Sequence, residues 1–148
     1  MLRPKPGWTS ILCLLIALST GTTTAVSQAQ ALKPKLSALP DSLLPMGCSY
    51  SLDDWKGNML AWAPYQYEGN TQANNLRMSI DGEVRELPIN SRSDYHISAY
   101  DGRYYVDIRI PSWKRVGSEL SQARATLLVR NTRTYTETNI LVRASQGC

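Results

Sequence analysis

The 148-residue sequence contains a single histidine, His96, which is the first candidate for acid–base catalysis. A catalytic histidine needs a carboxylate that orients it and a nucleophile within hydrogen-bonding reach. Asp94 lies two residues before it, and Asp107 would face it if the two segments form a hairpin. Because a solvent-facing histidine explains the same pattern more simply, we expect a protein that is not an enzyme. A hydrolase is the least favoured alternative.

Metal sites and paired catalytic carboxylates have little support in the sequence. One histidine and three cysteines are too few for a closed zinc site of the Cys₄ or Cys₂His₂ type. Asp53 and Asp54 are adjacent carboxylates, but they lie in a predicted loop, where acidic residues are common because they suit turns. We therefore expect no metal ion and no cofactor.

The cysteines predict one disulfide bond. Cys13 lies in an N-terminal segment that we expect to be removed on export, which leaves Cys48 and Cys148. Two thiols in an oxidising compartment pair most economically with each other. The bond would bring the two ends of the domain together, because bonded cysteines have Cα atoms within about 7 Å of each other.

The N-terminal segment has the layout of a secretory signal peptide. Arg3 and Lys5 supply positive charge, and a short apolar run follows at Ile11–Leu18. Small residues at Ala29 and Ala31 favour cleavage after Ala31, with cleavage after Ala29 as the alternative. The apolar run is far shorter than the roughly 20 residues of a transmembrane helix.

These features divide the chain into three parts. We expect residues 1–31 to be the signal peptide, residues 32–45 a linker or N-terminal arm, and residues 46–148 one β-sandwich domain. The mature protein would be secreted or periplasmic, without a transmembrane segment. Its net charge would be +2, which is small for a protein that tracks phosphates, so nucleic-acid binding is not expected.

Arginine is the most abundant charged residue of the chain and suggests an anion-binding face. Alternation along the predicted strands directs Arg109, Arg124, Arg130 and Arg143 away from the apolar side. If their strands lie side by side, the guanidinium groups form an outer face suited to carboxylate, sulfate or phosphate groups. The alternative is a solvated sheet face whose charges protect exposed strands.

Aromatic residues in or beside predicted loops offer a second type of binding site. An amphipathic ring in a loop can stack on a sugar or anchor a protein partner. The alternative role is core filling, which some rings must perform because the chain has no phenylalanine; Trp62 and Tyr104 are the best candidates. The loop candidates are Trp55, Tyr65, Tyr67 and Trp113.

The remaining pattern is one of short alternating strands joined by tight turns. Apolar residues alternate with polar ones on both sides of Asp81-Gly82 and of Asp101-Gly102, and Asp-Gly is a preferred pair for a type I′ hairpin turn. The fold class is therefore all-β, a small antiparallel β-sandwich or barrel of about eight strands. The predicted strands cover residues 47–52, 58–65, 76–80, 84–89, 95–99, 104–110, 123–130 and 136–143.

Several short motifs span nearly all of residues 47–148. They are Gly47-Cys48-Ser49-Tyr50, Ile80-Asp81-Gly82 followed by Leu87, Tyr100-Asp101-Gly102 leading to Val106-Asp107-Ile108, and the closing Gly147-Cys148. Together they resemble a group of small exported bacterial β-proteins without an assigned activity. The resemblance implies the fold and export, and it implies no catalytic residues. Members of that group often carry further cysteines at both ends. This chain has one cysteine at each end of the domain, so a second disulfide is not expected here.

The function expected from these observations is that of an exported, non-catalytic binding or envelope-associated β-domain. Its partner would be an envelope protein or an anionic glycan, the ligands that arginine and loop aromatics suit best. The alternative is a structural or accessory envelope protein with no ligand site.

Overall fold

The computed structural model describes residues 31–43, 47–64 and 74–148. In these ranges the chain is almost entirely β-structure, with one 3₁₀ helix of three residues, η1 (Asp41–Leu43). In chain order the strands are β1 (Leu36–Ser37), β2 (Ser49–Asp53), β3 (Met59–Pro64), β4 (Asn75–Ile80), β5 (Glu83–Ser93), β6 (His96–Tyr100), β7 (Tyr104–Arg109), β8 (Lys114–Arg115), β9 (Leu120–Asn131) and β10 (Thr136–Gly147).

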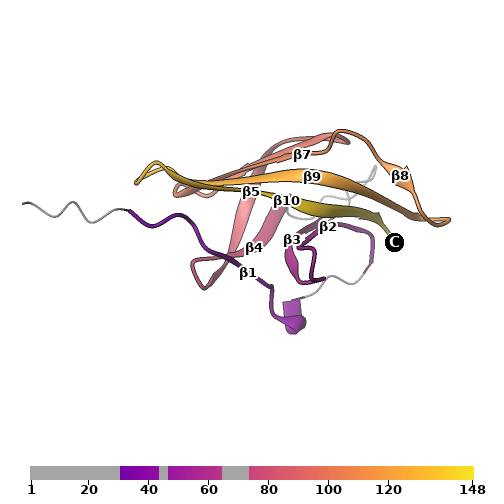
Figure 1. The fold of residues 1–148 in the computed structure, drawn as a ribbon, viewed down its shortest axis with the longest axis horizontal. Coiled ribbons are helices and arrows are strands. Elements are labelled where there is room, and N and C mark those ends of the chain that lie inside the picture. Colours follow the sequence, from indigo (N-terminus) through magenta and orange to yellow (C-terminus); the bar gives the residue numbers. More distant parts are fainter. Residues whose placement is uncertain (1–30, 44–46, 65–73) are drawn as a thin grey trace, which may run out of the picture.

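Eight of these strands close into an antiparallel barrel (Figure 1). From β2 onward each barrel strand pairs with the next, β8 lies beside β9 off this path, and β10 returns to pair with β2. Because β4 pairs with both β3 and β5, the sheet has no break at which it could separate into two layers. The prediction of an all-β antiparallel sandwich or barrel of about eight strands is confirmed, and of these two architectures residues 46–148 have the barrel, although we had named that domain a β-sandwich.

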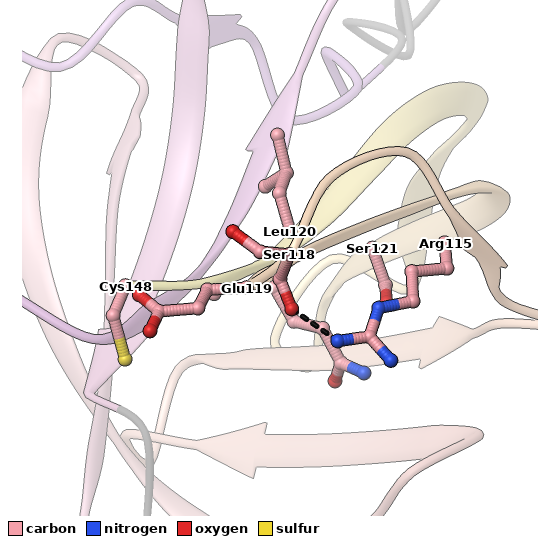
Figure 2. Close-up of a pocket in the computed structure, with 8 residues that line it drawn as sticks. Arg115, Ser118, Glu119, Leu120, Ser121 and Cys148 are labelled. Atoms are coloured by element: carbon pink, nitrogen blue, oxygen red, sulfur yellow. Dashed lines mark hydrogen bonds between the residues drawn. The ribbon is translucent and has the colours of Figure 1, made fainter.

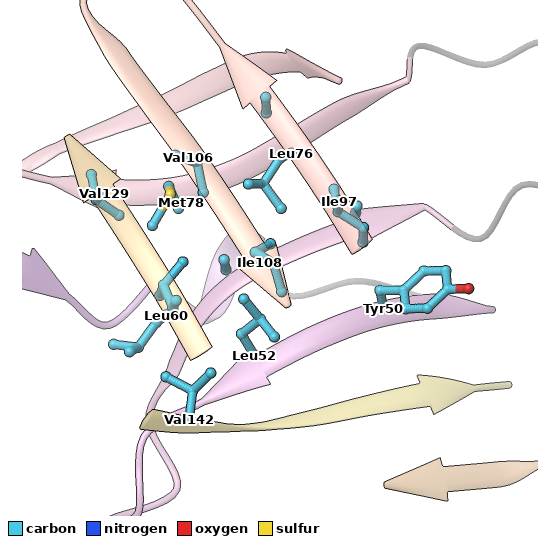
Figure 3. Close-up of a cluster of buried hydrophobic side chains, with 14 of the residues drawn as sticks. Tyr50, Leu52, Leu60, Leu76, Met78, Ile97, Val106, Ile108, Val129 and Val142 are labelled. Atoms are coloured by element: carbon cyan, nitrogen blue, oxygen red, sulfur yellow. The ribbon is translucent and has the colours of Figure 1, made fainter. Parts of the chain in front are cut away.

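The interior of the barrel is a packed apolar core. Figure 3 shows side chains from strands all around the barrel converging there, among them Leu52, Met78, Ile108, Val129 and Val142. Burying an aliphatic side chain of this size contributes about 1.5–3 kcal/mol to stability. An eight-stranded barrel is just wide enough for side chains to fill it, as they do here.

The two aromatic residues predicted for the core have different positions. Tyr104 is fully buried, as predicted. The prediction for Trp62 is wrong, because it lies on the outer face, where the Arg77 guanidinium is 5.0 Å from its ring centre and its Nε1 donates to the Leu43 carbonyl at 2.9 Å. Ala61 and its strand neighbours Leu60 and Ala63 are buried instead.

The two Asp-Gly turns differ in geometry. Asp81 and Gly82 have φ angles of 54° and 83°, as the type I′ prediction requires. At the second hairpin only Gly102 has a positive φ, of 90°. There the Asp101 carboxylate accepts the backbone N–H groups of Arg103 and Tyr104, at 2.9 and 2.7 Å, which stabilises a longer loop.

Part of the expected linker or arm is integrated into the sheet. In β1, Leu36 pairs with Ile80 of β4, and the neighbouring Leu39 donates its backbone N–H to the Met59 carbonyl of β3 at 2.8 Å. Leu39 is buried. Only two residue pairs join β3 to β4, and β1 pairs with the next part of the same edge of β4. In Figure 1 the indigo ribbon of this segment passes beside β4.

A polar network covers the end of the core at which the Asp-Gly turns lie. The Tyr104 hydroxyl donates to Asp81 at 2.5 Å, and Arg85 donates to Asp101 at 2.9 Å while its guanidinium lies 4.8 Å from the Tyr104 ring centre. Burial acts to raise the pKa of both carboxyls, but hydrogen bonds, including one from the Lys35 N–H to Asp81, outweigh it and hold both pKa values below their usual range. Both groups therefore favour the folded state when ionised.

Acid is expected to weaken this end of the barrel. A carboxyl with a lowered folded pKa contributes fully to stability above the unfolded pKa of about 3.9 and loses its contribution as the pH falls through the folded value. The Asp101→Asn variant should therefore lose less stability than the wild type between pH 6 and pH 3 in thermal unfolding. Asp41→Asn, at an exposed carboxylate of η1, is the control and should follow the wild type. An unchanged pH profile for Asp101→Asn would contradict the expectation.

Candidate functional site

The predicted disulfide between Cys48 and Cys148 is present. It lies where the start of β2 meets the end of β10, two strands that pair across the barrel closure. Beside it lies a pocket of about 330 Å³ whose lining includes Arg115, Ser118, Glu119 and Cys148 (Figure 2). Because Arg115 lines it, this pocket is one candidate for an anion site.

The pocket beside the disulfide is poorly suited to an anion. Arg115 donates through Nε to the Gly117 carbonyl at 3.1 Å and through Nη2 to the Ser118 carbonyl, the contact dashed in Figure 2. Glu119 adds a negative charge to the lining. A Cβ added at Gly147 would clash with the Glu119 carbonyl, so backbone segments approach closely here. These features indicate a structural role in closing the barrel.

The four arginines of the predicted anion-binding face lie on three neighbouring strands. Arg109 is on β7, Arg124 and Arg130 are on β9, and Arg143 is on β10. The register places Arg124 opposite Arg143, and Arg109 opposite Thr126, two residues further along β9. Arg130 is six residues from Arg124, about 20 Å at the usual rise of a strand. The structure therefore brings three of the four together.

Two of these arginines join a predicted loop aromatic in one groove. The Arg124 guanidinium lies 5.5 Å from the ring centre of Trp55, a residue that is 59% exposed in the turn between β2 and β3. Beside this pair is a groove of about 540 Å³, which we call the Trp55 groove. Its lining is Trp55, Pro111, Ser112, Lys114, Val116, Gln122, Ala123, Arg124 and Arg143.

The Trp55 groove is strongly basic. Lys114, Arg124 and Arg143 are its charged lining residues, and no acidic side chain of the described segments lines it. One acidic group lies close to these cations: Asp53, whose Oδ2 is 3.5 Å from Arg143 Nη2. Asp53 compensates part of the Arg143 charge, whereas within the described part of the chain neither Lys114 nor Arg124 is in an ion pair. Much of the positive charge therefore remains available to a ligand.

Arg109 belongs to a second cluster on the outer face. Asp107 is largely buried and accepts hydrogen bonds from His96 Nε2 at 2.6 Å and Arg109 Nε at 2.8 Å. Burial opposes ionisation of Asp107, but these hydrogen bonds prevail and lower its pKa. The hairpin thus places Asp107 against His96, the arrangement in which Asp107 would orient the histidine of a hydrolase. Because Asp107 also pairs with Arg109, the three side chains form one hydrogen-bonded network that joins β6 and β7.

The other predicted site residues have separate positions. Arg130 pairs with Glu137 at 2.9 Å and lines a different groove. Trp113 donates its Nε1 hydrogen to the Asp94 carbonyl at 2.6 Å and packs against Tyr50, which indicates a structural role. The two remaining loop aromatics, Tyr65 and Tyr67, lie outside the described residues.

Two basic residues with informative surroundings were not among the predicted arginines. Lys114 lines the Trp55 groove, and its place next to the loop residue Trp113 was the available sequence signal. Arg92 faces inward opposite Ile97 and lies 5.3 Å from the Tyr50 ring centre, and burial lowers its pKa. No sequence signal marks Arg92, because its orientation follows from a bulge between Ile89 and Ser91.

The described segments contain neither a cluster of metal ligands nor a membrane-spanning helix. Among the described residues, no three His, Cys, Asp or Glu side chains are grouped so that they could hold a metal ion. No helix in these segments is long and apolar enough to cross a bilayer.

Comparison with known proteins provides no relative. No family model, no curated protein and no solved structure matches the chain. The Trp55 groove is therefore the strongest basis for a functional inference, because it unites two independently predicted classes of binding residue, the outward arginines and a loop aromatic.

Proposed function

We propose that this protein is an exported, non-catalytic binding module that takes an anionic glycan in the Trp55 groove. The observation that carries the proposal is the exposed Trp55 indole, 5.5 Å from the Arg124 guanidinium, at the edge of a basic groove. Signal-peptide features in residues 1–31 and the disulfide between Cys48 and Cys148 support a secreted or periplasmic location.

The chemistry of the groove suits an acidic sugar. An indole face packs against the apolar face of a pyranose ring. Guanidinium groups form paired hydrogen bonds with carboxylate or sulfate, and Arg124 and Arg143 lie opposite each other on adjacent strands. The amide of Gln122 and the hydroxyl of Ser112 add neutral partners for sugar hydroxyls.

The second candidate is a structural or accessory envelope protein without a ligand site. The observation that favours it is the pairing of outer-face arginines within the protein: Arg130 with Glu137 and Arg143 with Asp53. The resemblance of the turn motifs to small exported bacterial β-proteins is compatible with both candidates.

Binding of acidic oligosaccharides tests the proposal. Isothermal titration with a galacturonate hexamer, a heparin hexasaccharide and neutral cellohexaose should show binding of an acidic ligand only, and it should weaken with added salt. Arg124→Ala should lower affinity about tenfold, because a hydrogen bond to a charged group contributes about 1.5–3 kcal/mol and tenfold corresponds to about 1.4 kcal/mol. Trp55→Ala should lower affinity by a similar factor, because it removes the ring against which the sugar packs.

Matched controls are available at the far end of the β9–β10 hairpin. Arg133 and Tyr135 are exposed residues of its turn, and Arg133→Ala and Tyr135→Ala should bind like the wild type. Equal affinities for the groove variants and the controls, or no binding of either acidic ligand, would favour the structural alternative.

A further inference from the structure

A second groove continues the Trp55 groove across the outer face of the barrel. It has a volume of about 500 Å³ and is lined by Tyr95, His96, Arg109, Ile110, Pro111 and Thr126; we call it the Arg109 groove. Pro111 lines both grooves, so they adjoin at that residue. Each groove has an exposed aromatic side chain, Tyr95 in one and Trp55 in the other.

The register arranges the arginines of both grooves in a diagonal row. Arg143 lies opposite Arg124 on adjacent strands, and Arg109 lies one strand further, two residues along from Arg124. With strands about 4.8 Å apart and a rise of about 3.4 Å per residue, the Cα atoms of the row span about 12 Å. A ligand that meets all three cations must therefore be longer than one sugar ring.

Arg109 is held in a position suited to a ligand. Its Nε donates to Asp107 at 2.8 Å, and Asp107 is itself held by His96. The Arg109 side chain is 75% exposed, and within the described part of the chain its two Nη groups make no hydrogen bond. A guanidinium fixed at one nitrogen and free at the other two loses less conformational freedom when it binds an anion.

We infer that the Trp55 and Arg109 grooves form one extended site whose ligand is an acidic polysaccharide bound through several consecutive sugar units. The inference rests on the proposed function and specifies its ligand class. Arg124 and Arg143 meet the acidic groups of one part of the glycan chain, and Arg109 meets those of the next. Tyr95 and Trp55 offer ring faces at the two ends of the site.

Affinity as a function of ligand length tests the extended site. Galacturonate oligomers of one, two, four and six units, with cello-oligosaccharides of equal length as neutral controls, are titrated against the mature protein. Affinity should rise about tenfold from the dimer to the hexamer, as added contacts on one chain act together. Heparin oligosaccharides of matched length carry sulfate in addition to carboxylate, so tighter binding of heparin than of galacturonate would assign part of the recognition to sulfate.

The variants separate the two grooves. Arg109→Ala should weaken binding of the hexamer about tenfold and leave binding of the dimer unchanged, whereas Arg124→Ala should weaken both. Arg133→Ala is the matched control and should change neither. Thermal unfolding of each variant checks that Arg109→Ala leaves the barrel folded.

The outcomes distinguish failure of the inference from failure of the proposed function. If acidic oligomers bind but affinity does not grow with length, or Arg109→Ala leaves the hexamer unaffected, the extended site is overturned and the Trp55 groove stands. Equal binding of the neutral oligomers would also overturn it. If no acidic oligomer of either chemistry binds, both the proposed function and the extended site are wrong.

Discussion

Replacing Cys48 and Cys148 together with serine is expected to lower the free energy of unfolding by about 4–5 kcal/mol. The bond closes a loop with a sequence separation of 100 residues, and the chain-entropy relation assigns about 4.7 kcal/mol to a loop of that length. This is a large share of the roughly 5–15 kcal/mol typical of a domain. Because the bond joins the ends of β2 and β10, its loss also weakens the pairing that closes the barrel.

Urea denaturation of the mature protein measures this effect. The double serine variant and the wild type under reducing conditions should show the same lowered midpoint, since both lack the bond. The oxidised wild type should retain the higher midpoint. A difference below about 1 kcal/mol would mean that the disulfide constrains the unfolded chain far less than the entropy relation assumes. Detection of two free thiols in the exported protein by mass spectrometry would contradict the bond itself.

Leu127→Ala is expected to destabilise the barrel by about 2–5 kcal/mol. Leu127 is fully buried at the centre of β9 and pairs with Ile108 on one side and Ile140 on the other. Truncating such a side chain removes its transfer free energy and leaves a cavity that neighbouring strands fill only in part. In a closed barrel each neighbouring strand is held on both edges, so collapse into the cavity is restricted.

Leu141→Ala is the matched control for this substitution. Leu141 lies on the adjacent strand β10, but it points outward and the residue is 60% exposed. The same change there should alter stability by no more than about 0.5 kcal/mol. Equal destabilisation by the two variants would contradict the assignment of inner and outer faces, because alternation places the two leucines on opposite sides of the sheet.

The candidate site was predicted in parts and assembled only by the fold. Alternation along the strand was enough to direct Arg124 and Arg143 outward, and turn composition was enough to place Trp55 in a loop. Their meeting depended on the register of β9 against β10 and of β10 against β2, which spacing along the chain does not contain. Arg130 shows the converse, since it was predicted with the same arginines and lies far from them.

The wrong prediction for Trp62 and the lack of any prediction for Arg92 both arise where alternation is interrupted. A register shift between Leu52 and Asp53 accompanies the placement of Trp62 on the outer face, and a second between Ile89 and Ser91 turns Arg92 into the barrel. A bulge adds one residue to one strand of a pair and thereby exchanges the faces beyond it. Bulges depend on the partner strand, so a count along one segment does not reveal them.

By itself, the sequence determined the antiparallel strands, the tight turn at Asp81-Gly82 and the pairing of Cys48 with Cys148. These features follow from side-chain alternation, from backbone conformations that few residues adopt, and from having only two cysteines after residue 31. Only the tertiary structure decided that the sheet closes into a barrel and that Trp55 lies beside Arg124. Both depend on pairing between segments far apart in the chain, whose register is set by the packing of the whole core.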